Sequence, residues 1–318
     1  MGDLELRPST DDDADAMVDI ARRRISAITG RPHPMTAESL RGMRSAPGRD
    51  QGGAFPVVTI DDRVVGFAVF FAAEPYSEIY LMAHTDPDLD QQTYGRVLEL
   101  LVDDGERYAQ GRLAGLPPGV ASALVSDTLQ DDVRMAEVLA RLGFEVDRHA
   151  YEMAIDLSRD RREPTAWPEG VEVRRISGPD DAEAVSSVFM TAFLDHQGDL
   201  PFTPEMIGHQ LAGPDVRLDV STLAFDDEGP VGAIICRDRV DHGYVWVLGV
   251  LRRGRRRGLA QALLTHAFAD FAATGTTVVT LEVEADSLTG ATRVYERAGM
   301  GVRTVHDTWA RPVVRSAG

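Results

Sequence analysis

Residues 245–264 read VWVLGVLRRGRRRGLAQALL, and this stretch decides the fold that we predict. An apolar segment is followed by a short turn rich in arginine and glycine, and apolar residues at helical spacing begin near Gly258. The start of a helix exposes unpaired backbone N–H groups and a partial positive charge, which together favour phosphate binding. The stretch therefore predicts a strand, a turn and a helix that bind a diphosphate.

The residue types in this turn suit a diphosphate. Gly258 lets the backbone approach a pyrophosphate without a Cβ atom in the way, and Ala260 keeps the next turn small. The neighbouring arginines add charge-assisted donors. The stretch is not a P-loop, because no Gly-Lys-Ser/Thr follows, and it lacks the three-glycine spacing of a dinucleotide-binding turn.

Working outward from this stretch, the chain repeats one order of elements. Each half opens with a short strand and an acidic helix start, continues through a hairpin near Asp61-Asp62 or near 226–229, and closes with a helix that ends in glycine. This order predicts an α/β fold of two lobes, each with a mixed, mostly antiparallel sheet flanked by helices. The polar segment SRDRREPTAWPEG separates them. We therefore predict a lobe over 1–157, a linker over 158–170 and a second lobe over 171–318.

Two motifs carry a family resemblance. Arg255-x-x-Gly258-x-Ala260 after a strand resembles the Gln/Arg-x-x-Gly-x-Gly/Ala turn of the GNAT acetyltransferase superfamily, which binds the pyrophosphate of acetyl-CoA. Further on, EVEADS at 282–287 and ATRVYERAGM at 291–300 are similar to that superfamily's fifth strand, Asx-containing turn and Tyr-x-x-x-Gly-Phe helix. Because both halves take part, the chain most resembles tandem GNAT proteins of the mycothiol synthase type, and the likeness covers nearly its whole length.

The resemblance implies acetyl-CoA as co-substrate and assigns roles to residues of the second half. Backbone N–H groups along the strand 248–250 would hold the pantetheine arm and polarise the thioester carbonyl. Tyr295 would protonate the leaving sulfur. The expected cofactor-binding residues are Leu248, Gly249, Val250, Arg255, Arg256, Arg257, Gly258, Leu259, Ala260, Gln261, Ser287 and Tyr295.

The general base is the weak point of this assignment. Mycothiol synthases have a glutamate where this chain has Tyr244, and a phenol with a pKa of about 10 is a poor base at neutral pH. This departure also puts mycothiol synthesis itself in doubt. The substitutes left open are His242 with Asp241, Glu282, Glu284, and a water relay to a remote carboxylate.

The first half has lost the same motifs. Superposing the two halves by sequence places Asp90 opposite Arg255, Thr93 opposite Gly258 and Leu139 opposite Tyr295. The turn 86–90 is acidic where a pyrophosphate would bind, and like charges repel. We therefore expect the first lobe to be a degenerate copy without a productive site.

Composition narrows the function further. The net charge of −18 argues against nucleic-acid binding and favours cationic partners. No apolar run reaches the roughly 18 residues of a membrane span, and the N-terminus does not resemble a signal peptide. The single cysteine, Cys236, fits a reducing compartment, so we expect a cytoplasmic protein. The histidines lack metal-site spacing, so no metal is expected, although Asp195, His196 and Asp199 either bind a cation or solvate a loop.

These observations predict an acetyl-CoA-dependent N-acetyltransferase. It would act on a primary amine of a small, cationic metabolite by direct transfer in a ternary complex, as a monomer or homodimer. Two alternatives stay open, which are a non-catalytic acyl-CoA-binding protein and a transferase for a longer acyl group. The depth of the pocket behind the segment 247–249 would decide the acyl length.

Overall fold

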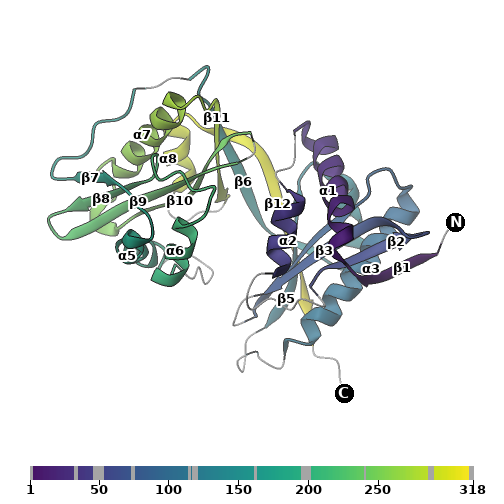
Figure 1. Ribbon diagram of the computed structural model, residues 1–318. Coiled ribbons are helices and arrows are strands. Elements are labelled where there is room, and N and C mark those ends of the chain that lie inside the picture. Colours follow the sequence, from purple (N-terminus) through teal and green to yellow (C-terminus); the bar gives the residue numbers. More distant parts are fainter. Residues whose placement is uncertain are drawn as a thin grey trace. The chain divides into compact units, whose positions relative to one another are not determined.

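The computed structural model describes residues 3–31, 35–45, 54–72, 76–113, 116, 121–160, 163–194, 202–239, 241–285 and 290–314. They form two compact units (Figure 1). The first unit comprises residues 1–149 and 305–318, and the second comprises residues 150–304.

The first unit is built on a mixed sheet in the order β1-β2-β3-β4-β5-β12. Neighbouring strands are antiparallel, except that β4 and β5 are parallel. The strands are β1 (Leu4–Pro8), β2 (Pro56–Ile60), β3 (Arg63–Ala72), β4 (Glu78–Thr85), β5 (Ser122–Leu129) and β12 (Gly301–Val313). The helices are α1 (Ala14–Thr29), α2 (Ala37–Ser45), α3 (Gln91–Gln110) and α4 (Val133–Arg141).

The second unit repeats this plan, with the strand order β6-β11-β10-β9-β8-β7. Here β10 and β11 are the parallel pair. The strands are β6 (Glu145–Asp156), β7 (Glu172–Arg175), β8 (Thr222–Asp226), β9 (Gly229–Asp238), β10 (Gly243–Val250) and β11 (Val278–Glu284). The helices are α5 (Ala182–Ala192), α6 (Pro204–Leu211), α7 (Leu259–Ala273) and α8 (Ala291–Arg297). The predicted mixed sheets flanked by helices are therefore confirmed.

The last strand of each half of the sequence completes the sheet of the other half. In the second unit, β6 pairs with β11 from Ala150 to Asp156. In the first unit, β12 pairs with β5 from His306 to Val313. The boundaries of the compact units therefore differ from those of the lobes predicted by dividing the chain at the linker. Residues 150–157 belong to the second unit, and residues 305–318 belong to the first. A strand's side-chain pattern predicts that it pairs but not with which edge, so the exchange was not visible in the sequence.

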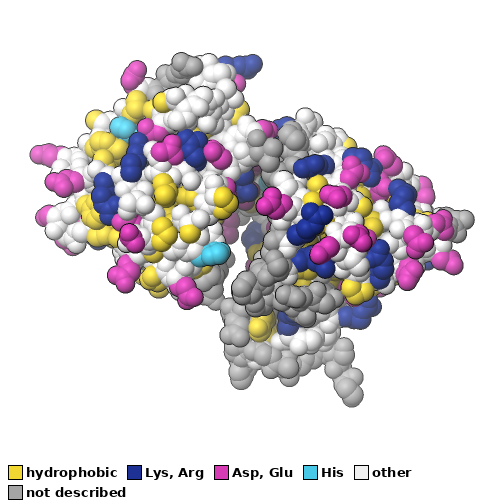
Figure 2. Space-filling view, in the orientation of Figure 1, with side chains coloured by type: hydrophobic (Ala, Val, Ile, Leu, Met, Phe, Trp, Pro, Cys, Tyr) yellow, Lys and Arg dark blue, Asp and Glu magenta, His cyan; other side chains and the backbone are white. Residues whose placement is uncertain are grey.

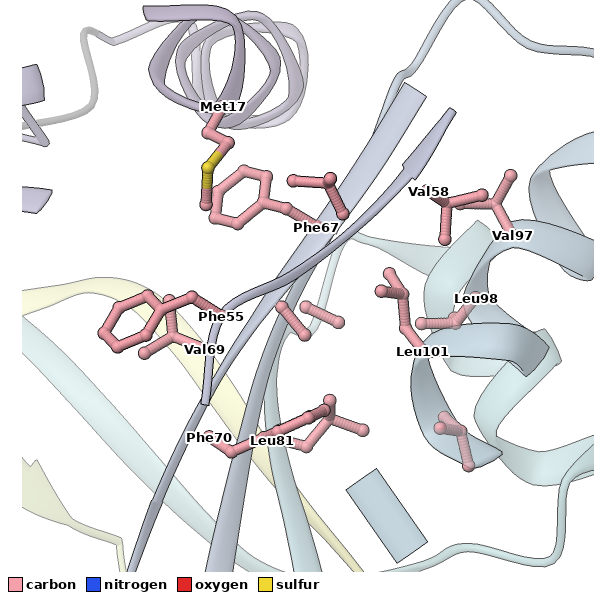
Figure 3. Close-up of a cluster of buried hydrophobic side chains, with 14 of the residues drawn as sticks. Met17, Phe55, Val58, Phe67, Val69, Phe70, Leu81, Val97, Leu98 and Leu101 are labelled. Carbon is pink, nitrogen blue, oxygen red and sulfur yellow. The ribbon is translucent and has the colours of Figure 1, made fainter. Parts of the chain in front are cut away.

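The core of the first unit fills both faces of its sheet (Figure 3). On one face, Met17 of α1 lies against Phe67 of β3. On the other face, apolar side chains of α3 pack on the strands; Val97, Leu98 and Leu101 are among them. These helices show apolar residues at helical spacing in the sequence, which is why each buries one side.

The second unit has one apolar cluster on each face of its sheet. Side chains of α7 pack with alternate residues of β9 and β11 on one face, and Phe271 and Leu281 are examples. Side chains of α5 and α6 pack on the opposite face around Phe189 and Ile207. We call these the α7 face and the α5 face. Among the described residues, no helix combines the length and apolar character needed to cross a bilayer.

The linker segment has no helix or strand in its described residues, yet it is tied to α7. The backbone N–H of Thr165 donates to Oγ1 of Thr265 over 3.0 Å. The ring of Trp167 stacks on that of His266, with centroids 4.2 Å apart. The segment therefore lies along the helix that follows the predicted cofactor turn.

The strand exchange generates a prediction for a chain that ends at Thr304. Although the deletion removes only the last residues of the chain, it exposes the edge of β5 in the first unit. It also removes Trp309, whose indole N–H donates to Thr128 over 3.0 Å. We expect hydrogen exchange, followed by mass spectrometry, to speed up in residues 122–129 and not in 243–284.

A chain that ends at Val314 keeps β12 and serves as the control, with exchange unchanged in both regions. Faster exchange confined to 243–284 in the shorter chain would contradict the exchange of strands.

Candidate active site

The turn between β10 and α7 is held in place by backbone hydrogen bonds and by one buried glycine. The N–H of Leu251 donates to the carbonyl of Val231 over 2.9 Å, and the N–H of Gly254 donates to that of Leu251 over 2.9 Å. A Cβ atom on Gly254 would lie 2.7 Å from Cγ2 of Val231, so no larger residue fits there. The sequence prediction missed Gly254, because a structural glycine in a turn looks like any other.

The helix α7 begins without a side-chain cap. Gly258 precedes it with φ of 87°, in the left-handed region that favours glycine, and no side chain bonds to the first turn. The first intrahelical bond is from the N–H of Ala262 to the carbonyl of Gly258 over 2.9 Å. The N–H groups of residues 259–261 consequently point out of the helix start with no partner in the described part of the chain.

The arginines of the turn have different surroundings. Arg255 donates from Nε to the carbonyl of Val250 and from Nη2 to that of Ala192, so it ties the end of β10 to the end of α5. Arg257 donates to the carbonyl of Glu169 in the linker segment over 2.5 Å. Arg256 is exposed, has φ of 60°, and makes no hydrogen bond or ion pair to a described residue. Of these three, Arg256 is the guanidinium left for a phosphate.

The strands β10 and β11 part shortly after they begin. They pair only at Gly243 with Val279 and at Tyr244 with Thr280, while β10 stays paired with β9 as far as Val250. Beyond Tyr244, backbone N–H and C=O groups on the β11 side of β10 thus lack a strand partner. An extended ligand with amide groups can supply the missing bonds, as an added strand would.

A bulge interrupts β10 between Val245 and Val247. Its effect is that two successive side chains, Trp246 and Val247, pack on the α5 face. Leu248 and Val250 then lie against the α7 face. A β-bulge adds one residue to a strand and redirects the side chains around it. The sequence, read as an uninterrupted strand, did not predict this change of face.

Tyr295 lies on α8 and packs against the cluster of the α7 face. Burial raises the pKa of Tyr295 to about 12. The phenol of Tyr295 therefore keeps its proton at neutral pH. Ser287 was also expected to bind the cofactor. It lies outside the described residues, as do Asp195, His196 and Asp199.

The structure separates the candidates for the base. Tyr244 is 7% exposed, and burial together with the charge of Glu282 raises the pKa of its phenol, so even less of the basic phenolate form is present at neutral pH. The guanidinium of Arg239 lies 4.2 Å from the centre of its ring. His242 bonds to Asp241 over 2.5 Å at the start of β10. At a rise of roughly 3.3 Å per residue, His242 lies about 20 Å along the strand from Leu248.

Glu282 and Glu284 share one face of β11, the face opposite to that of Leu281. Counting on from the pair of Tyr244 and Thr280 places Glu282 level with the bulge of β10. Its side chain is exposed, and its charge reaches the phenol of Tyr244. Counted along the strands, Glu282 and Tyr244 thus lie nearer than His242 to the open stretch of β10.

In the first unit, an aspartate side chain caps the N-terminus of the corresponding helix. Asp90 caps α3 and accepts from the N–H groups of Gln92 and Thr93, each over 3.0 Å. Asp90 therefore stands where Gly258 stands, and the predicted pairing of Thr93 with Gly258 is wrong by three residues. The sequence superposition failed because the turn from strand to helix has five residues here and eight in the second unit. The pairing of Leu139 with Tyr295 agrees with the matching turns that end α4 and α8.

The parted strands of the first unit are also filled. Arg24, whose side chain is 6% exposed, bonds to Asp132 at the start of α4 and donates to the carbonyl of Ala83 on β4 over 3.3 Å. The buried ion pair of Arg24 and Asp132 thus lies beside β4. Asp86 of the acidic turn is itself neutralised by Arg23 and Arg63.

The described cysteine, histidine and carboxylate side chains bear on two other kinds of site. Cys236 is buried, and burial raises the pKa of its thiol, which disfavours a nucleophilic role. In the described part of the chain, no three His, Cys, Asp or Glu side chains are grouped as a metal site would need. On the face that Figure 2 shows, acidic and basic side chains are interspersed rather than gathered into one patch.

Comparisons with known proteins agree with this geometry. Residues 184–300 match the acetyltransferase (GNAT) family model. Over 307 residues the chain is 25% identical to a mycothiol acetyltransferase of Gordonia bronchialis, with 92% of each chain covered.

Two solved structures show the same fold. A GCN5-related N-acetyltransferase from Sphaerobacter thermophilus has a TM-score of 0.78 at 24% identity, covering 98% of this chain and 96% of that one. A tandem GNAT protein from the clavulanic acid biosynthesis pathway has a TM-score of 0.73 at 16% identity, covering 99% and 100%. Residues 184–300 therefore match the GNAT acetyltransferase family, the chain has a tandem GNAT fold, and it is similar to a mycothiol acetyltransferase along its length.

Proposed function

We propose that this protein is an acetyl-CoA-dependent N-acetyltransferase with one cofactor site, in its second unit. The observation that supports this most directly is the difference between the two units. At the same place in each fold, the second has an uncapped helix start beside an open strand edge, and the first has a capped helix and a buried ion pair.

The residues present suit acetyl-CoA. The N–H groups at the start of α7 and the guanidinium of Arg256 would bind the pyrophosphate. The open edge of β10 from Leu248 to Val250 would bind the amides of the pantetheine arm. Arg255 and Arg257 would act mainly by fixing the turn, since each already donates to backbone carbonyls.

The transfer itself forms a C–N bond and breaks the C–S bond of the thioester. A neutral amine attacks the carbonyl carbon, and backbone N–H groups of β10 stabilise the oxyanion. The amine gives up its proton to a base, and the departing thiolate takes one from the phenol of Tyr295. Both substrates are bound together, so the acetyl group passes directly from sulfur to nitrogen.

We assign the base to Glu282, with Glu284 two residues further along the same face of β11 as the second choice. Glu282 lies level with the bulge, and its carboxylate is a better base than the phenol of Tyr244, whose pKa is raised. The acceptor is a primary amine on a small molecule. The carboxylates of this face and the net charge of −18 favour a cationic one.

The cofactor site predicts different outcomes for two similar glycines of α7. Gly258 and Gly275 flank the helix with φ of 87° and 88°, and neither would bring a Cβ atom within 4 Å of another residue. Replacing either with Val strains the backbone to a similar degree. We expect Gly258→Val to weaken acetyl-CoA binding at least tenfold by calorimetry, while Gly275→Val retains wild-type affinity and a stoichiometry of one. Unchanged affinity in Gly258→Val would show that the cofactor binds elsewhere.

The proposed activity is tested by release of CoA when acetyl-CoA is mixed with a panel of amines, aminoglycosides and amino-sugar thiols. For an amine that is acetylated, we expect Tyr295→Phe to lower kcat about 100-fold without changing the affinity for acetyl-CoA, since the ring remains and only the proton donor is lost. Tyr151→Phe, in the same apolar cluster, is the control and should retain full activity. Tight acetyl-CoA binding without turnover of any amine would instead support a non-catalytic acyl-CoA-binding protein.

The assignment of the base predicts the order of three substitutions. Glu282→Gln should lower kcat by about 100-fold or more, because the amide cannot accept the proton of the amine. Tyr244→Phe and His242→Gln should each lower it less than fivefold. The measurement is kcat at saturating acetyl-CoA as a function of pH. A large loss in His242→Gln with full activity in Glu282→Gln would overturn the assignment.

A further inference from the structure

Four aromatic side chains form a continuous layer on the α5 face of β10, which we call the aromatic wall. Phe189 and Phe193 come from α5 and its last turn, Phe202 precedes α6, and Trp246 is on β10. Ring centroids are 5.3 Å apart for Phe189 and Phe202, 5.3 Å for Phe193 and Phe202, and 6.4 Å for Phe202 and Trp246. All four belong to the second unit.

The wall lies directly on the backbone of β10. A Cβ atom on Gly249 would be 2.7 Å from Cδ1 of Phe189 and 3.3 Å from Cβ of Ala192. Only a glycine lets α5 approach this closely. The side chain of Phe189 is completely buried, so the layer behind Gly249 is packed solid at that point.

Two features hold the wall in position. The bulge of β10 turns both Trp246 and Val247 to the α5 face, which adds a side chain to the layer. Arg255 donates to the carbonyls of Val250 and Ala192 and so fixes the end of α5 against the end of β10. The wall is thus tied to the same turn that begins the proposed cofactor site.

The geometry points to a role for this wall in the choice of acyl donor, and this inference rests on the proposed function. Phosphates bound at the start of α7 would lie on the α7 face of the sheet, because that helix packs there. An acyl chain carried past the open edge of β10 toward the opposite face would meet the layer that contains Phe189 and Trp246. We propose that the wall limits the donor to short acyl groups, and that Phe189 and Trp246 are the residues that determine this specificity.

The test compares kcat/KM for acetyl-, propionyl-, butyryl- and hexanoyl-CoA. We expect the wild-type value to fall at least tenfold from acetyl- to butyryl-CoA. In Phe189→Leu the ratio of butyryl- to acetyl-CoA should rise at least fivefold, because a shorter side chain leaves space behind Gly249. Trp246→Ala provides the same test at a half-buried position if Phe189→Leu does not fold.

Phe225→Leu is the matched control. Phe225 packs in the same apolar cluster, but it lies on β8 rather than β10, so its loss should leave the ratio unchanged. Equal use of hexanoyl- and acetyl-CoA by the wild type would overturn the proposal, as would an unchanged ratio in both wall variants.

Binding separates this inference from the proposed function. If no amine is acylated with any donor, the transferase proposal fails, and the wall is then tested by calorimetry alone. At least tenfold tighter binding of acetyl- than of hexanoyl-CoA by the wild type, with the difference reduced in Phe189→Leu, would support the wall. Equal affinities would refute it.

Discussion

The parting of β10 and β11 is the constraint on which the second unit depends. Two parallel strands that pair for only two residues leave a row of backbone groups unbonded, and unpaired groups away from water are costly. A ligand that runs along this edge, as we propose for acetyl-CoA, would replace the missing strand. The turn after β10 then delivers the uncapped start of α7 to the end of the same edge, so the strand and the helix present donors to one extended molecule.

The first unit has the same arrangement of strands and helix, with its polar groups bonded within the protein. The parallel pair β4 and β5 also stops after three residues, so the geometry itself is retained. Its helix N–H groups donate to Asp90, however, and the strand carbonyl of Ala83 accepts from Arg24, which is paired with Asp132. A buried ion pair of this kind is costly to disrupt, because either partner alone would be an unpaired buried charge.

Much of the fold could be predicted from the sequence, because periodicity and turn residues are local signals. The hairpins near Asp61-Asp62 and at 226–229 and the strand–turn–helix around Gly258 lie where they were predicted. The sequence superposition of the two halves failed at Asp90. The turn before α3 is three residues shorter than the turn before α7, and the amino-acid composition does not reveal this difference. The bulge in β10 was also missed. In an uninterrupted strand, the side chains of Trp246 and Val247 would point to opposite faces. Only their packing in the cluster with Phe189 and Phe202 shows that both lie on one face.

By itself, the sequence determined the strand, turn and helix around Gly258 and predicted the kind of site there, because a helix start preceded by glycine and arginine favours phosphate. It also predicted, from the acidic turn 86–90, that the first half lacks such a site. Only the tertiary structure decided which arginine is left for a ligand, which carboxylate lies level with the bulge, and which sheet each final strand completes. These depend on contacts between residues far apart in the chain, such as Arg255 with Ala192, and no local pattern specifies them.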